Sequence, residues 1–178
     1  MKEVLLISAF LFCSSIYAQK YKSNKSIVTF YSEAILENID ASNSKAQSIL
    51  DISSNEIVFS IPIDGFVFEK ELMQEHFNEK YMETEKFPKS TFLGKFLGFD
   101  VNKKGEQKVT ASGKLMIHGI ERKISVEGEM IVEGNKIKLN SNFKVKLKDY
   151  KIAIPQLLWQ NIAEEVEVEL LFEYTKIN

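Results

Sequence analysis

The sequence predicts a mainly β protein in which seven or eight antiparallel strands close into a barrel next to a single helix. Residues 136–147 and 162–174 alternate between apolar and polar side chains, as expected for a sheet with one dry and one wet face. Only the stretch 72–92 leaves the strand pattern, because its apolar residues recur at helical spacing. Closure would remove the exposed strand edges. A sandwich of two sheets is the alternative.

The first residues have the features of an export signal. Lys2 precedes an apolar run, Val4 to Phe12, that is shorter than the roughly 20 residues of a membrane-spanning helix. Small residues lead to a cleavage point after Ala18, although Ile16 is larger than usual at its position. We therefore expect a signal peptide over residues 1–18.

The remaining residues, 19–178, have the size of one ordinary domain. Cys13 is the only cysteine, so the mature domain has no disulfide and no thiol chemistry. A lipoprotein signal acylated at Cys13 is the alternative, but Phe12 stands where that signal needs a small residue. With a net charge of −2 and no later membrane span, the expected product is a soluble periplasmic domain that binds neither nucleic acid nor an anionic membrane surface.

Ahead of the helix, the composition indicates two strands. Residues 27–36 are rich in β-branched and aromatic types, and residues 37–46 look like a loop. Glu56 to Ile63 places its isoleucines and a phenylalanine on one face, and Pro62 indicates that the strand ends there or lies at an edge. The helix is expected over about residues 70–83, before Pro88. Its apolar stripe consists of Leu72, Met73, His76, Phe77 and Tyr81.

After Pro88 the strand pattern becomes regular. The expected strands are 90–99, 108–117, 122–132, 136–147 and 162–174. The turn signals between them are Asn102–Gly105, His118–Gly119 and Glu133–Asn135. The outer face of 136–147 is rich in lysine and that of 162–174 in glutamate, so these two faces would attract each other if the strands were neighbours.

The residues give little support to catalysis. His76 and His118 are the only histidines, and no nucleophile elbow or phosphate loop accompanies them. Glu75, His76 and Glu79 do not form the HExxH pattern of a zinc site. We expect no enzyme activity, no metal and no cofactor. The thirteen Phe, six Tyr and one Trp either fill the barrel or line a ligand cavity, since a barrel of this size can do either.

Two segments resemble the YceI-like family of exported proteins with a lipocalin-like barrel. The first contains Leu72, Phe87–Pro88 and Thr91–Phe92, which match the family's leucine-led helix, its aromatic–proline pair and the strand beginning with Phe. The second, Val109 to Ile124, is similar to the family pattern Gly-x-Leu-Thr-x-His-Gly-Val-x-Arg/Lys. Its matching residues are Gly113, Leu115, His118, Gly119 and Arg122 or Lys123.

Several positions depart from the family. Met116 stands where Thr is usual, the lead into the helix is Glu69–Leu72 in place of Arg-Asp-His-Leu, and Asn24–Ser26 replaces a His-Ser strand motif. The chain therefore looks like a divergent branch, and polar ligand contacts at these positions are not carried over.

The resemblance implies an antiparallel, eight-stranded, lipocalin-like barrel whose bore holds a long amphiphilic lipid, such as a polyisoprenoid or a fatty-acid derivative. The expected function is that of a binding or carrier protein. Candidate ligand-binding residues are Phe59, Phe77, Tyr81, Phe92, Phe96, Leu115, Ile117, His118, Phe143 and Trp159, with Arg122 as a second candidate for the head group. For each apolar candidate, plain core packing is an equal alternative.

Two other functions compete with the lipid carrier. A filled barrel could dock a protein partner through residues 153–159, where Trp159 is a suitable anchor. An enzyme acting on a lipid is the third reading, with few acid–base candidates to support it. An exposed strand edge would also allow a homodimer, although no feature demands one.

Overall fold

The computed structural model describes residues 19–33, 38–154 and 163–177. The expected signal peptide and Trp159 lie outside these residues. The helical elements are the 3-10 turn η1 (Ile63–Gly65), α1 (Glu71–His76), its π-helical continuation η2 (Phe77–Tyr81) and η3 (Leu147–Tyr150). The strands are β1 (Lys20–Ser32), β2 (Ile39–Asn43), β3 (Gln47–Asp51), β4 (Glu56–Pro62), β5 (Val67–Phe68), β6 (Lys89–Leu97), β7 (Gly105–Ile117), β8 (Ile120–Glu133), β9 (Lys136–Lys146) and β10 (Glu165–Lys176).

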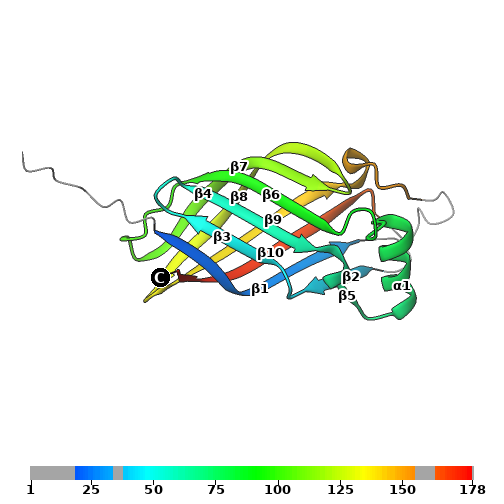
Figure 1. Cartoon of the computed structure of the whole chain (residues 1–178), viewed down its shortest axis with the longest axis horizontal. Coiled ribbons are helices and arrows are strands. Elements are labelled where there is room, and N and C mark those ends of the chain that lie inside the picture. Colours follow the sequence, from blue (N-terminus) through cyan, green and yellow to red (C-terminus); the bar gives the residue numbers. More distant parts are fainter. Residues whose placement is uncertain (1–18, 34–37, 155–162, 178) are drawn as a thin grey trace, which may run out of the picture.

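The sheet is antiparallel and closed, because β1 pairs with β10 as well as with β3 and β2. β3 pairs with the beginning of β1 and β2 with its end, so the two share one position in the ring, and the short β5 is added outside β2. The result is an elongated eight-stranded barrel (Figure 1). The barrel predicted from the sequence is confirmed, and the sandwich alternative is wrong.

The predicted attraction between the last two strands is present. β9 and β10 are neighbours throughout their length. Lys136 lies 2.9 Å from Glu173, and Lys144 lies 3.5 Å from Glu165, each distance joining the ammonium nitrogen to a carboxylate oxygen. Both pairs lie on the outer face, where such contacts contribute little to stability individually but favour the correct neighbour.

The prediction of a loop over residues 37–46 is wrong, because Ile39–Asn43 forms β2. The next strand, β3, was not predicted either. The inward positions of these strands include Asn43 and Ser48, both fully buried. Polar residues at inward positions remove the alternation that identifies a strand. Here the Asn43 amide donates to the Pro62 carbonyl oxygen at 2.7 Å, and Ser48 Oγ accepts from Tyr174 at 2.7 Å.

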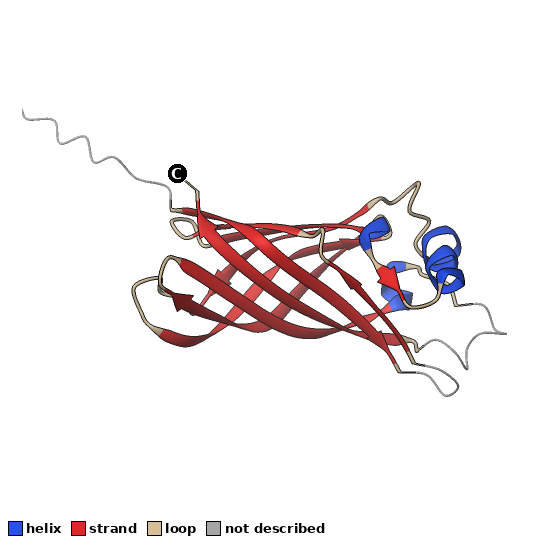
Figure 2. Ribbon diagram, turned by 90° about the horizontal axis from the view of Figure 1, so that it is seen from below, coloured by secondary structure: helices blue, strands red, loops and turns tan. Residues whose placement is uncertain are grey.

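The predicted helix is confirmed as one 11-residue segment made of α1 and η2. It lies across one end of the barrel, near the other helical turns (Figure 2). Leu72 does not belong to its buried stripe, because the Leu72 side chain is 61% exposed. Across the described residues, we find no helix with the length and apolarity needed to cross a membrane.

Candidate functional site: an apolar cavity in the barrel

The barrel encloses a cavity of about 330 Å³ under the helix. Inward-facing side chains of nearly every strand line it, and almost all of them are apolar. The helix contributes Met73, His76, Phe77 and Tyr81 from the face that it turns to the barrel. A cavity of this volume lies at the lower end of the range of small-molecule sites, which is about 300–1,000 Å³.

The opposite end of the barrel is filled by side chains. Tyr174 is fully buried there, beside the buried Leu50 and Ile137, and none of the three lines the cavity. Burial strongly raises the pKa of the Tyr174 phenol, so its hydroxyl stays protonated and donates to Ser48. Nearby, the buried Gln107 amide donates to the carbonyl oxygens of Asp100 and Lys103, closing the loop after β6 over this end.

Four packed phenylalanine rings hold the helix over the end of the barrel that lies opposite Tyr174. Phe77 stacks on Phe30 with ring centroids 5.5 Å apart and also contacts Phe66 and Phe68 at 5.7 and 5.0 Å. Aromatic pairs in such geometries add stabilisation beyond their buried area. Tyr81, one turn further along, is half-buried, and desolvation raises the pKa of its phenol. The helix is therefore a cap anchored by packing.

A pair of glycines makes room for one aromatic side chain inside the bore. Gly94 on β6 and Gly113 on β7 are directly paired, and both face inward. A Cβ atom at Gly94 would lie 2.6 Å from the Phe92 ring, and one at Gly113 would lie 2.8 Å from it. The Phe92 ring thus lies over the two glycines, and side chains at these positions would force it into the cavity.

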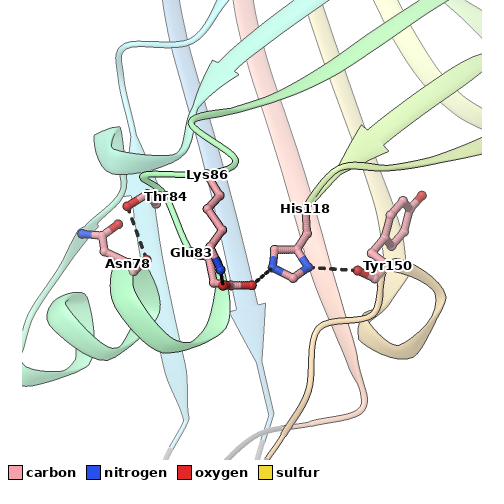
Figure 3. A network of polar contacts seen from close by, with 6 residues as sticks. All are labelled: Asn78, Glu83, Thr84, Lys86, His118 and Tyr150. Atoms are coloured by element: carbon pink, nitrogen blue, oxygen red, sulfur yellow. Dashed lines mark hydrogen bonds and ion pairs between the residues drawn. The ribbon is translucent and has the colours of Figure 1, made fainter.

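His118 links the cap to the barrel (Figure 3). It forms the turn between β7 and β8 with Gly119, and both residues have positive φ angles, 49° and 72°, as a type I′ hairpin requires. His118 Nε2 lies 3.1 Å from a Glu83 carboxylate oxygen, just after the helix, and Nδ1 lies 3.2 Å from the Tyr150 carbonyl oxygen. Both partners only accept hydrogen bonds, so both contacts are satisfied when each ring nitrogen carries a hydrogen.

Replacing Glu83 with Gln tests this link. Hydrogen bonds from Lys86 and His118 hold the pKa of the Glu83 carboxyl below its ordinary value of 4.5. A group with a lowered pKa stabilises the fold above its unfolded-state pKa, and the contribution disappears as the pH falls through the folded-state value. We expect the melting temperature of Glu83→Gln to lie below that of the wild type at pH 7, and the difference to shrink as the pH falls below 4.5 and to vanish once the pH lies below the lowered pKa of the Glu83 carboxyl. A difference independent of pH would contradict the charge-based link.

Most of the sequence-predicted site residues meet at the cavity. Those that line it are Phe59, Phe77, Tyr81, Phe92, Phe96, Leu115, Ile117 and Phe143. His118 does not line the cavity but fixes the turn beside it. Arg122 lies on β8 at a separate hollow in the wall, and Trp159 lies outside the described residues. Whether any of these side chains binds a ligand stays a prediction.

Sequence reasoning missed several residues at the cap end of the cavity. Phe30, Phe66 and Phe68 line the cavity, although the sequence pattern indicates no site role for any of them. The sequence signal for Phe66 and Phe68 is weak because β5 has only two residues, so neither the strand period nor the helix period can be recognised there. The available indication in the sequence is the two phenylalanines, Phe66 and Phe68, a few residues before the amphipathic helix.

These features agree with comparisons to known proteins. The model of the YceI-like domain matches residues 20–174. The chain belongs to the YceI-like family. None of the curated proteins gives a match. Among solved structures, a polyisoprenoid binding domain from Saccharophagus degradans, implicated in plant cell wall breakdown, superposes with a TM-score of 0.76 at 15% identity, covering 88% of this chain and 98% of that one.

Two further solved structures show the same fold. BcnA from Burkholderia cenocepacia has a TM-score of 0.69 at 16% identity, with 83% of this chain and 95% of that chain covered. The Campylobacter jejuni YCEI protein has a TM-score of 0.58 at 19% identity, with 100% and 99% covered. At these identities the likeness concerns the fold and not the ligand.

Proposed function

We propose that this YceI-like protein is an exported, non-catalytic protein that binds or carries a long-chain amphiphilic lipid, such as a polyisoprenoid or a fatty-acid derivative. The signal peptide over residues 1–18 would direct it to the periplasm, and residues 19–178 would act as a single domain. The observation that supports the proposal is the apolar cavity of about 330 Å³, closed at one end by Tyr174.

The chemistry of the lining favours an alkyl or isoprenoid chain as the occupant. Each methylene group that leaves water contributes about 0.8 kcal/mol, so a chain can be held firmly by an apolar wall with few polar contacts. The few polar side chains in the lining include Ser32, Ser90 and His76. The name of the Saccharophagus relative, a polyisoprenoid binding domain, supports the same class of ligand.

Native mass spectrometry of the mature protein, purified from the periplasm, tests this function. We expect a stoichiometric adduct, and organic extraction followed by mass analysis should yield a molecule with a long alkyl or isoprenoid chain. A mass of the bare polypeptide that does not change after incubation with a total lipid extract would contradict the proposal. That result would favour a barrel that docks a protein partner instead.

A further inference from the structure

The barrel wall is split between β8 and β9. These strands pair only from Glu129 to Glu133 and from Lys136 to Asn140, near the filled end. Toward the cap, the facing edges Arg122–Gly128 of β8 and Ser141–Lys146 of β9 share no ladder. By contrast, β8 pairs with β7 over its whole length, and β9 does so with β10. We call the region between the two unpaired edges the lateral window.

The lateral window has a defined frame. At the end nearer the filled end of the barrel, where the β8–β9 ladder stops, Ser141 Oγ donates to the Glu127 carbonyl oxygen at 2.7 Å. At the end nearer the helix, η3 bridges the two strands. Arg122 Nε donates to the Asp149 carbonyl oxygen at 3.0 Å. His118 contacts the Tyr150 carbonyl oxygen. Contacts at both ends hold the two edges in place, so the opening is part of the fold.

The lateral window adjoins the interior. It contains a hollow of about 510 Å³ whose inner wall consists of side chains that also line the main cavity. These shared residues are Leu115, Ile124, Val126, Phe143 and Val145. Only this layer of side chains separates the hollow from the main cavity, so this is the place where the polar part of a bound molecule would have the shortest way to the surface.

The outer rim of the lateral window is positively charged. Arg122, Lys123 and Lys144 line it, and Asp149 is the one carboxylate among its lining residues. Among the described residues, no carboxylate pairs with Lys123, and the Arg122 guanidinium has no partner beyond the Asp149 carbonyl group. Lys144 is 66% exposed beside Glu165. This excess of cations stands out in a chain whose net charge is −2.

We propose that the lateral window binds an anionic head group, of the phosphate or carboxylate class, on a lipid whose chain lies in the main cavity. The inference rests on the proposed lipid-binding function and adds a head-group class to it. Arginine and lysine donate charge-assisted hydrogen bonds to such oxygens. The aliphatic chain would pass between Ile124 and Phe143, and the head group would stay at the surface beside Arg122, Lys123 and Lys144.

Two probes with the same chain and different heads test the inference. Dodecyl phosphate and 1-dodecanol are titrated against the mature protein loaded with the neutral fluorescent probe N-phenyl-1-naphthylamine. We expect dodecyl phosphate to bind at least about tenfold more tightly than dodecanol. In Lys123→Gln/Lys144→Gln this advantage should disappear, while the affinity for dodecanol stays unchanged.

A matched control and two contrary outcomes complete the test. Lys138→Gln removes the same charge from β9 at the paired end of the strand, away from the lateral window, and should leave both affinities unchanged. Equal binding of the two probes in the wild type and all variants would overturn the inference and leave the lipid carrier intact, whereas failure of both probes to bind would count against the carrier itself. Displacement of dodecyl phosphate by equally dilute inorganic phosphate would reveal a site for free anions and would also overturn the inference.

Discussion

Under the proposed lipid-binding function, the variant Ala111→Trp should lose affinity for a long-chain ligand and stay folded. Ala111 is half-buried on β7, and its methyl group faces the main cavity. An indole side chain at this position extends into the empty space and occupies much of a volume of about 330 Å³. We expect at least about a tenfold weaker affinity for a long-chain ligand, because the methylene groups of the ligand lose their place in the cavity.

Thr110→Trp is the matched control for this change. Thr110 is the preceding residue of the same strand and points outward. The tryptophan of this variant therefore has the same side chain as in Ala111→Trp but does not enter the bore. Ligand affinity is followed by displacement of a neutral fluorescent probe, and folding by circular dichroism and thermal unfolding. Retention of full affinity in a folded Ala111→Trp protein would place the ligand elsewhere.

The variant Phe77→Ala should have the largest effect on the cap. It removes the ring that touches Phe30, Phe66 and Phe68. Truncation of a buried phenylalanine costs about 3–5 kcal/mol, and since Phe77 is half-buried we expect a loss of about 2–3 kcal/mol in the free energy of unfolding. Under the proposed function, a bound lipid should also dissociate faster, because the cap covers the cavity. Chemical denaturation and a ligand release assay measure the two effects separately.

Leu72→Ala provides the comparison on the same helix. The Leu72 side chain is 61% exposed, so the change in stability should stay within about 0.5 kcal/mol. Unaltered lipid release in Phe77→Ala, despite the lost stability, would assign the aromatic cluster to packing alone. Similar losses of stability in Phe77→Ala and Leu72→Ala would contradict the orientation of the helix.

The barrel was predictable where the strands follow a simple rule. In β9 and β10, apolar side chains face the core and lysine or glutamate faces water, so alternation alone identifies both strands and their attraction. β2 and β3 failed this rule because Asn43 and Ser48 occupy inward positions, where their hydrogen bonds satisfy them. Such partners lie far away in the chain, and a local pattern cannot contain them.

The features of the candidate site also divide into those that the sequence pattern predicts and those that it does not. Inward residues such as Phe59 and Phe143 followed from alternation, since any residue on the dry face points into the bore. The lateral window did not, because Arg122–Gly128 and Ser141–Lys146 read as ordinary strands on their own. Their failure to pair with each other depends on the course of two strands in space. The hollow interior likewise depends on how side chains fill a volume, which composition does not determine.

The filled end of the barrel has one more consequence. With Tyr174, Leu50 and Ile137 buried behind the cavity, the bore is a blind tube. In the proposed carrier, a lipid would enter such a tube with its tail leading, and the tail would be the last part to leave. The head of the lipid would therefore face outward, and it would be the first part that a receiving membrane or protein meets.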